Sequence, residues 1–341
     1  SHGPSKAAFT YLDLEEIESG RSTEVPEPTL EPVPDEWGEV AEQLGDSGTL
    51  VVWSKLDRCM WKNGTTVIQR SEFAIGRMYR AHINSGRTAI RMVAFDDATS
   101  RPYRIDKFAV ANDPGYLMHN TSTPEPYNEE PMFEKDGDRW TESFAIDYGG
   151  DKYDVHVRYS IAKAEARNRA DGKDAGKLGY GQHAQRNIGV SLVRAERELE
   201  LDQSLTVAYD PRERWWGVEV EFPPALDEVF GVTNNKQTAR NFVTIAQHFE
   251  DLLSAEGSTE TQTKASMEED GDPAAPLVEI IGAVHRRLRD LRGRIKVQRV
   301  NTRKPRHTRF DEKSAERVAT AATRERQNEG SEGLSDRDET R

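Results

Sequence analysis

The chain has 341 residues, of which 35% are hydrophobic and 31% are charged, and its formal net charge is −13. This acidity excludes a protein that binds nucleic acid over its whole surface, and the dilute apolar content predicts globular domains joined to solvated segments. Because Cys59 is the single cysteine, the chain can form neither an internal disulfide nor a cysteine-rich zinc site, and we expect a reducing, cytoplasmic location.

The sequence contains no apolar run of about 18 residues, the length that a membrane-spanning helix needs, and it lacks the features of a signal peptide. We therefore expect no membrane partner. The first residues read SHGPSKAAF without an initiator methionine, which indicates a processed, tagged or truncated piece of a longer protein.

The charge is distributed unevenly along the chain. Residues 1–50 contain twelve acidic and two basic side chains, whereas residues 277–309 contain eleven lysines and arginines with only Glu279 and Asp290 against them. The overall acidity therefore hides a basic segment near the C-terminus.

The first 57 residues predict two short strands joined by an irregular connector. Residues 7–14 (AAFTYLDL) have the aromatic content of a short strand, and the next segment, 24–39, carries four prolines and predicts an irregular connector. Residues 47–57 (SGTLVVWSKLD) form a compact apolar run, which predicts a buried strand.

A helix and a strand are predicted next. Residues 71–86 have a Ser start, apolar positions at helical spacing and a terminal glycine, and residues 87–97 alternate as a strand. Such a pair is the basic unit of a layered α/β domain. Residues 98–150 are rich in turn signals and predict loops with an insertion.

The centre of the chain predicts further strands and one long helix. Strands are expected at 152–162, as a pair within 187–202, and within 214–232, where two prolines stop the pattern. The stretch DGKDAGKLGYGQH between the first two predicts a solvated turn. Residues 235–253 place apolar side chains on one helical stripe.

Three segments are predicted at the C-terminal end. Residues 256–276 have the composition of a flexible linker, and residues 277–300 predict an amphipathic basic helix with an apolar seam. Residues 301–341 predict a mostly disordered tail with a short helical stretch near 311–327. The seam of the basic helix suits docking on another helix or dimerisation, with nucleic acid as a second interpretation of its charge.

Motifs for other chemistries are weak. DAGKLGYG (174–181) is not a phosphate-binding loop, since no Gly-Lys-Ser/Thr follows, and the eight histidines are scattered, so we predict no metal site. A nuclease site would use Asp210 with Glu219 and Glu221. The two glutamates share a strand face, but the lysine that such a site requires is missing nearby.

Cys59 is predicted to be a small buried hydrophobic residue. Trp215 and Trp216 are predicted to be core or interface aromatics.

Three segments together resemble one family. GTLVVWSKLD (48–57) looks like the closing strand of the ATP-binding domain in the GHKL superfamily, which includes gyrase B, heat-shock chaperones, histidine kinases and MutL. NIGVSLVRAERELELD and RWWGVEVEFPPALDEVFGVTNNKQ are similar to the transducer domain that follows it in bacterial members. The resemblance covers roughly 48–255, and its last motif is its most specific.

The resemblance implies a function for the loop TNNKQ. In that superfamily a transducer lysine reaches toward the γ-phosphate of ATP, so Lys236 carries over as the catalytic and cofactor-binding residue, with Asn235 and Gln237 as supporting donors. An ammonium on a flexible stem can bind a terminal phosphate only while it is present. A structural alternative is a capped helix start, with Thr233 or Asn234 as the N-cap.

The family's other motifs, an Asn-bearing helix, an Asp-x-Gly box and a glycine lid, do not precede residue 48. The resemblance therefore implies the C-terminal part of an ATPase whose ATP and Mg²⁺ are bound mainly by a missing N-terminal ATP-binding domain. An alternative function is a non-catalytic scaffold or nucleic-acid-binding protein that uses the basic helix.

The predicted fold class is α+β. Residues 1–62 would be the last strands of a GHKL ATP-binding sandwich, 63–255 a ribosomal-protein-like transducer α/β domain, and 277–300 a C-terminal helix.

Overall fold

The computed structural model describes residues 6–38, 47–56, 59–96, 101–167, 173–255 and 259–295. Helices and strands are both abundant and the main sheet mixes parallel and antiparallel pairs, so the protein is of the α+β class, as predicted. Two compact units are present, Ser1–Met60 and Trp61–Arg341. No helix of the described residues is long and apolar enough to cross a lipid bilayer.

The first unit contains one small hairpin. Strand β1 (Lys6–Phe9) pairs antiparallel with β2 (Thr29–Pro32). The helix α1 (Leu14–Glu18) lies between them in sequence. It begins at Leu14 because the Asp13 carboxylate accepts hydrogen bonds from two amides of its first turn. The predicted strand at 7–14 is therefore a shorter strand followed by the start of a helix. A 3₁₀ turn, η1 (Asp35–Trp37), follows β2.

The apolar run at 47–57 is not a buried strand over its described residues, 47–56, and this prediction was wrong for the chain by itself. These residues have no regular structure, and Val51 and Trp53 are 72% and 80% exposed. A strand is stable only when a neighbour satisfies its backbone groups and a second layer covers its side chains. Among the described residues, no strand pairs with this segment.

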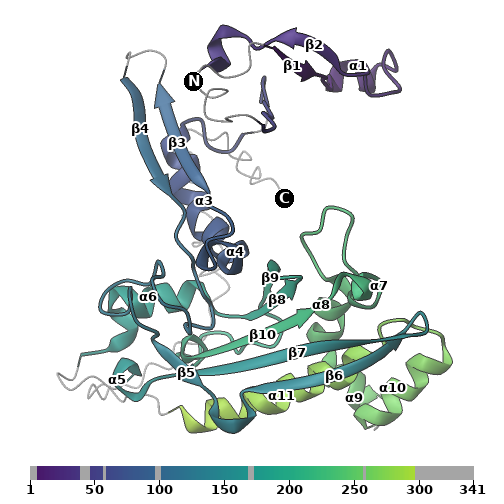
Figure 1. Ribbon diagram of the computed structural model, residues 1–341. Helices are drawn as coiled ribbons and strands as arrows, with labels where there is room; N and C mark the ends of the chain where they lie inside the picture. The colour runs from purple at the N-terminus through teal and green to yellow at the C-terminus, as the bar shows by residue number, and fades with distance from the viewer. Residues whose placement is uncertain are drawn as a thin grey trace, which may run out of the picture. The chain divides into compact units, whose positions relative to one another are not determined.

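The second unit is built on a six-stranded sheet (Figure 1). The order β5-β7-β10-β8-β9 forms the main path, and β6 adds a second antiparallel neighbour to β7. β10 runs antiparallel to β7 and parallel to β8. The strands are β5 (Phe133–Lys135), β6 (Thr141–Tyr148), β7 (Asp151–Ala162), β8 (Val190–Arg194), β9 (Arg197–Asp202) and β10 (Trp216–Phe222).

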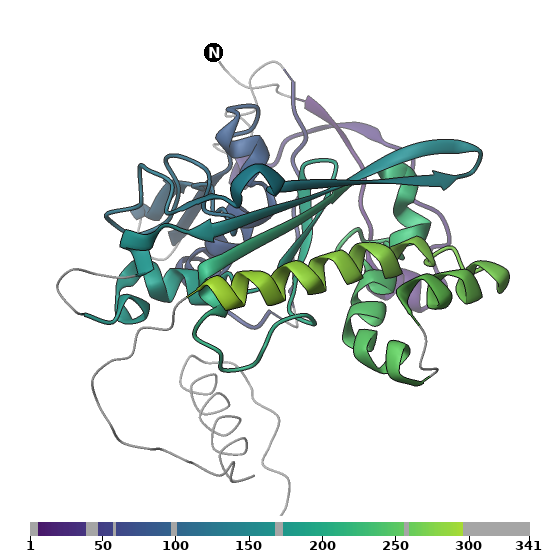
Figure 2. The ribbon, with the colours of Figure 1, turned by 90° about the horizontal axis from the view of Figure 1, so that it is seen from below.

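The long helix α11 (Pro276–Arg294) covers one face of this sheet, lying along β7 and β10 (Figure 2). Alternate residues of β10, such as Val218 and Val220, point into the same core as Leu277 and Leu288 of α11, and all four are at most 2% exposed. The helices α8 (Arg240–Gln247), α9 (Phe249–Ala255) and α10 (Glu260–Glu269) complete this layer. The apolar seam of α11 is thus buried within the chain.

Two boundaries predicted near the C-terminus are corrected. The segment 256–276 contains α10, which begins with a capping box between Thr259 and Gln262 and is therefore not an unstructured linker over its described part. The basic helix ends at Arg294, because Ile295 has an extended backbone. The predicted tail at 301–341 lies outside the described residues.

The opposite side of the second unit carries a smaller α/β layer. α3 (Gly64–Met78) and α4 (Arg80–Asn84) are followed by the hairpin of β3 (Arg91–Asp96) and β4 (Arg101–Phe108). Ile68, Met92, Ala94 and Ala109 form its own small core. The predicted helix at 71–86 and the predicted strand at 87–97 both exist, but the helix begins earlier because Asn63 caps its first turn.

Two predicted loop regions contain regular elements. The segment 98–150 supplies β4, β5, β6 and the turn η3 (Gly137–Arg139). The glycine-rich stretch after the short helix α5 (Ala164–Arg167) forms η4 (Ala175–Lys177) and the helix α6 (Gly179–Arg186). Gly181 lies within α6, and a Cβ at this position would collide with the Ala175 carbonyl. The glycine therefore allows close packing of α6 against η4 and does not form a turn.

Candidate functional site

The loop predicted to bind phosphate lies between two short helices after β10. The turn η6 (Pro224–Leu226) leads into α7 (Asp227–Phe230), which ends at Gly231 with a left-handed φ of 66°. Val232 and Ala239 then form an antiparallel bridge. The residues between them, 233–238, therefore close as a small hairpin loop that extends from the body beside α7 (Figure 1).

Lys236 occupies the tip of this loop in an uncommon backbone conformation. Its φ is 54°, in the left-handed region, and its amide donates a hydrogen bond of 2.8 Å to the Thr233 carbonyl. A residue with a Cβ adopts this region at a cost that the surrounding contacts must offset. One such contact is the guanidinium of Arg197, which donates a 3.1 Å hydrogen bond to the Lys236 carbonyl.

The Lys236 ammonium is paired with a carboxylate. Its Nζ lies 2.8 Å from Oδ2 of Asp227, and the side chain is still 43% exposed. Arg194 binds the same carboxylate through two bonds, Nε to Oδ1 at 2.5 Å and Nη2 to Oδ2 at 2.9 Å. Burial raises the pKa of Asp227, but the bonds from Arg194 and Lys236 outweigh it and hold that pKa below its usual value.

Asn235 and Gln237 shape the loop itself. The Asn235 Oδ1 accepts a 2.5 Å hydrogen bond from the Thr233 hydroxyl and a 3.3 Å bond from the Gln237 amide, and the Asn235 Nδ2 donates to the Gln237 side chain. The structure therefore brings the three predicted residues together. Only the lysine directs a charged group outside the loop's own hydrogen bonds.

The alternative interpretation of this segment, a capped helix start, is not realised. The helix α8 begins at Arg240, and its N-cap, Ala239, has no side-chain cap. Its amide instead donates a 2.6 Å bond to Oε1 of Glu200 on β9. The predicted helix starts five residues later than expected, because residues 235–239 belong to the loop and its closing bridge.

Four partners of the loop were missed by sequence reasoning: Asp227, Arg194, Arg197 and Glu200. They lie 9 to 42 positions from Lys236 in the chain, and the sheet brings them together. One signal was present in β8, where Val190, Leu192 and Arg194 lie on the same face and the first two are fully buried. A charged residue that continues an apolar row predicts an opposing charge nearby.

A second group of charges is buried between α4 and the polar face of the sheet. Arg80, 3% exposed, donates to Glu198 at 2.8 Å, to Ser191 at 2.8 Å and to Glu219 at 2.5 Å. Burial disfavours its charge, but the surrounding carboxylates raise the pKa of Arg80 well above its usual value. Every group of this set is satisfied by another, which fits a structural role.

The nuclease alternative does not assemble. Glu219 and Glu221 share a strand face as predicted, but both pair with Arg158, at 2.8 and 2.7 Å. Asp210 pairs instead with Arg212 at 2.6 Å. Among the described residues, no group of three or more His, Cys, Asp or Glu side chains is placed to hold a metal ion.

Other predicted residues take structural positions. Trp215 and Trp216 are buried, at 8% and 2% exposure, as expected for core aromatics. Cys59 is exposed, so its predicted burial was wrong.

Comparisons of this chain with protein-family models, with curated proteins and with solved structures give no match.

Proposed function

We propose that this chain is the coupling module of a GHKL-type ATPase, in which Lys236 binds the terminal phosphate of ATP held by a partner ATP-binding domain. The observation that carries the proposal is the ion pair between Lys236 and Asp227, at 2.8 Å on a projecting loop. A lysine held this way can exchange one anionic partner for another. Nucleotide state would thereby be converted into a change of loop position.

Because Asp227 has a second cationic partner, breaking its pair with Lys236 costs little free energy. When Lys236 leaves, the carboxylate keeps its two bonds from Arg194, so no uncompensated charge remains. A partly exposed ion pair contributes only about 0–1 kcal/mol. A bond between the Lys236 ammonium and a phosphate is also charge-assisted, so it can compete with the Lys236–Asp227 ion pair.

The loop is also connected to the sheet at two points. The Arg197 guanidinium binds the Lys236 carbonyl, and Glu200 binds the Ala239 amide. Both residues belong to β9, next to the buried charges around Glu198. A displacement of the loop would therefore change hydrogen bonds at an edge strand of the sheet.

The first unit supports the presence of a partner domain. None of its described residues is buried, while several large apolar side chains are exposed, among them Leu14, Leu30, Val51 and Trp53. Exposed apolar groups at this density are typical of a surface that another protein layer covers. In the proposal this layer is the ATP-binding domain, which would also hold ATP and Mg²⁺.

The experiment measures ATP hydrolysis by the full-length product of the gene. We expect Lys236→Ala to lower kcat by about tenfold or more, since it removes a charge that stabilises the transferring phosphate, and Lys236→Arg to retain part of the rate. The control is Lys264→Ala, because Lys264 has a carboxylate, Glu279, at the same 2.8 Å distance on another surface. Equal turnover in the Lys236 and Lys264 variants would refute the proposal.

A further inference from the structure

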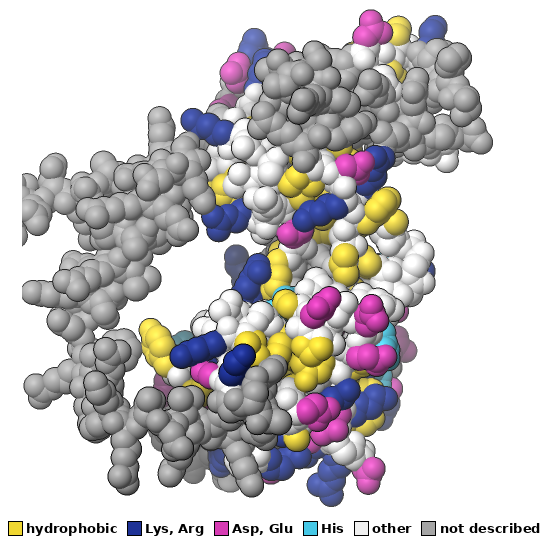
Figure 3. Space-filling view, turned by 90° about the vertical axis from the view of Figure 1, so that its left-hand side faces the viewer, with side chains coloured by type: hydrophobic (Ala, Val, Ile, Leu, Met, Phe, Trp, Pro, Cys, Tyr) yellow, Lys and Arg dark blue, Asp and Glu magenta, His cyan; other side chains and the backbone are white. Residues whose placement is uncertain are grey.

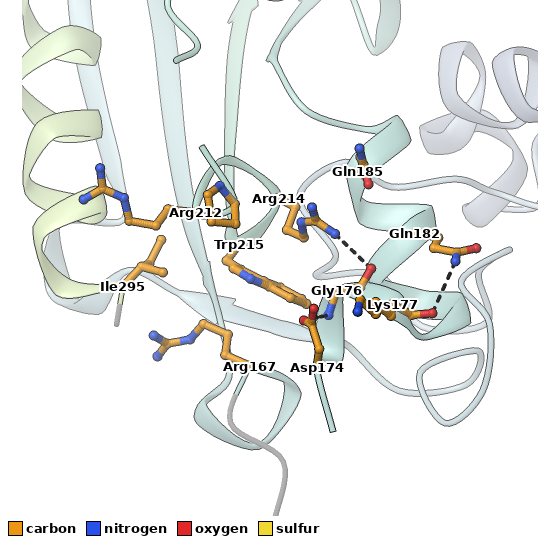
Figure 4. Close-up of a pocket in the computed structure, with 11 residues that line it drawn as sticks. Arg167, Asp174, Gly176, Lys177, Gln182, Gln185, Arg212, Arg214, Trp215 and Ile295 are labelled. Carbon is orange, nitrogen blue, oxygen red and sulfur yellow. Dashed lines mark hydrogen bonds between the residues drawn. The ribbon is translucent and has the colours of Figure 1, made fainter. Parts of the chain in front are cut away.

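A cavity of about 440 Å³ lies at the end of α11, away from the Lys236 loop, whose residues do not line it. Its wall comes from α5, η4, α6, the turn η5 (Glu213–Trp215) and the residue after α11 (Figure 4). The indole of Trp215 lies in the middle of the lining, with Arg214 on one side and Arg167 and Arg212 toward α11. A volume of this order suits a small molecule.

The lining is strongly basic. Four cations contribute to it, Arg167, Lys177, Arg212 and Arg214, against the single acid Asp174. The Asp174 carboxylate is already engaged, since it accepts a 2.9 Å hydrogen bond from the Gly176 amide and so caps η4. The cavity therefore holds an excess of positive charge.

Three of these cations have no carboxylate partner among the described residues. Arg212 pairs with Asp210, whereas within the described residues Arg167 and Arg214 donate to backbone carbonyls, those of Ala162 and Gly176, each at 2.9 Å. The exposed ammonium of Lys177 has no ion pair among the described residues. Elsewhere in this unit, buried arginines such as Arg80 are matched by acids.

The partly buried guanidinium groups are incompletely satisfied. The Nε of Arg214 is buried without a hydrogen-bond partner in the described part of the chain. Burial lowers the pKa of both Arg167 and Arg214, and it outweighs the opposite effect of the Glu134 and Asp174 carboxylates. An anion in the cavity would supply the missing acceptor and charge.

We propose that this cavity binds a small phosphorylated molecule. Arginine forks match phosphate oxygens in a bidentate manner, and a lysine adds a mobile point charge. Gln182 and Gln185 of α6 line the same wall and offer amide groups, and Trp215 offers an apolar surface. These groups suit a ligand with one or two phosphates and a compact organic part.

An extended nucleic acid fits the surroundings less well. Three cations of α11 pair with acids of the chain itself, Arg286 with Glu260, Arg287 with Asp136 and Arg292 with Glu213. On the face drawn in Figure 3, acidic and basic side chains of the described residues are interspersed. A duplex requires a continuous basic track.

The experiment titrates the 341-residue chain with pyrophosphate, adenosine monophosphate and a short single-stranded oligonucleotide at constant ionic strength. Binding is measured by calorimetry and by the shift of the melting temperature. We expect saturable binding of pyrophosphate or the nucleotide. Arg214→Gln should weaken it by about tenfold or more, as the loss of a charge-assisted contact does. Arg289→Gln, on the exposed side of α11, should bind like the wild type.

Two further variants keep the test decisive if Arg214→Gln does not fold. Lys177→Gln changes an exposed side chain of the lining, and Arg167→Gln changes the cation on the opposite side. Loss of binding in either variant with retained circular dichroism supports the proposal. The proposal is overturned if no small phosphate binds saturably, if only the oligonucleotide binds, or if all lining variants bind as tightly as Arg289→Gln.

Discussion

The Lys236 ammonium and the Asp227 carboxylate lie 2.8 Å apart across a loop whose tip has a left-handed backbone. The pair joins Lys236, the single cation of residues 233–238, to an acid that Arg194 already neutralises. It is therefore a contact that the protein can break without exposing an unpaired charge, and its strength is open to direct measurement.

A double-mutant cycle on this pair should give a small coupling. We expect Lys236→Met and Asp227→Asn to interact by no more than about 1 kcal/mol in urea unfolding, because the lysine side chain is 43% exposed. A coupling above about 2 kcal/mol would mean a fixed structural ion pair, since buried pairs reach such values and exposed ones do not. In that case a reversible exchange with phosphate would be untenable.

Removal of the buried guanidinium of Arg80 should be far more costly. Arg80→Met removes the buried partner that Glu198 and Glu219 share and leaves each with one cation, Arg77 and Arg158 respectively, so we expect a loss of about 3 kcal/mol in the free energy of unfolding. The matched control is Arg87→Met, whose pair with Glu196 is about half exposed on both sides and should change stability by less than about 1 kcal/mol. Similar losses in the two variants would contradict the assigned burial.

The imidazole of His183 should make stability fall on mild acidification. Burial, followed by the charge of Arg186, lowers its pKa from 6.5 to about 4. The unfolded chain therefore binds this proton at higher pH than the folded chain, so the stabilisation is complete above pH 6.5 and decreases as pH falls toward 4. The full effect is at most about 3.5 kcal/mol at 1.36 kcal/mol per pKa unit.

Urea unfolding of the wild type and of His183→Gln across this range measures the effect. The wild type should lose stability relative to the variant between pH 6.5 and 4, and an imidazole NMR titration should show the low pKa. Parallel pH profiles would show that His183 titrates normally.

Two helical glycines should respond in opposite directions to alanine. A Cβ at Gly76 in α3 would collide with the Val110 carbonyl, whereas a Cβ at Gly293 in α11 meets nothing within 4 Å. We expect Gly76→Ala to destabilise by about 1–3 kcal/mol through overpacking, and Gly293→Ala to stabilise by up to about 1 kcal/mol through helix propensity. Thermal unfolding measures both, and a stabilising Gly76→Ala would show that α3 packs less closely.

The core role of α11 is tested by cavity formation. Leu288 is fully buried under the sheet, and Leu14 in the first unit is 73% exposed. Leu288→Ala should lower the free energy of unfolding by about 2–5 kcal/mol, while Leu14→Ala should have almost no effect on the same transition. A mild Leu288 variant would indicate that α11 can detach from the sheet.

Several elements followed directly from local pattern. The strict alternation in β7 and β10 and the stripe of Phe242 and Ile245 in α8 need no distant information, because side-chain period alone separates strand from helix. The seam of α11 was equally visible. The run of Thr and Asn residues before Lys236 indicated a loop, but it was expected directly between a strand and a helix that starts at residue 235, whereas the loop lies between α7 and α8.

Local sequence pattern gave wrong or incomplete predictions where the burial of a segment depends on which other part of the chain packs against it. The run at 47–57 has the composition of a buried strand, yet Trp53 is exposed because the described residues offer it no neighbour. Gly181 was assigned to a turn, although it allows α6 to touch η4. The α11 seam alone could not distinguish a partner helix from the chain's own sheet.

The sequence by itself determined the α+β class, the succession of central strands and the presence of a lysine at a loop tip. Only the tertiary structure decided that Lys236 is held by Asp227, that Arg194 shares this acid, and that Arg167, Lys177 and Arg214 line one cavity. The physical reason is distance along the chain. Periodicity reports the environment of neighbouring residues, whereas ion pairs between residues tens of positions apart exist only once the sheet has fixed the register of its strands.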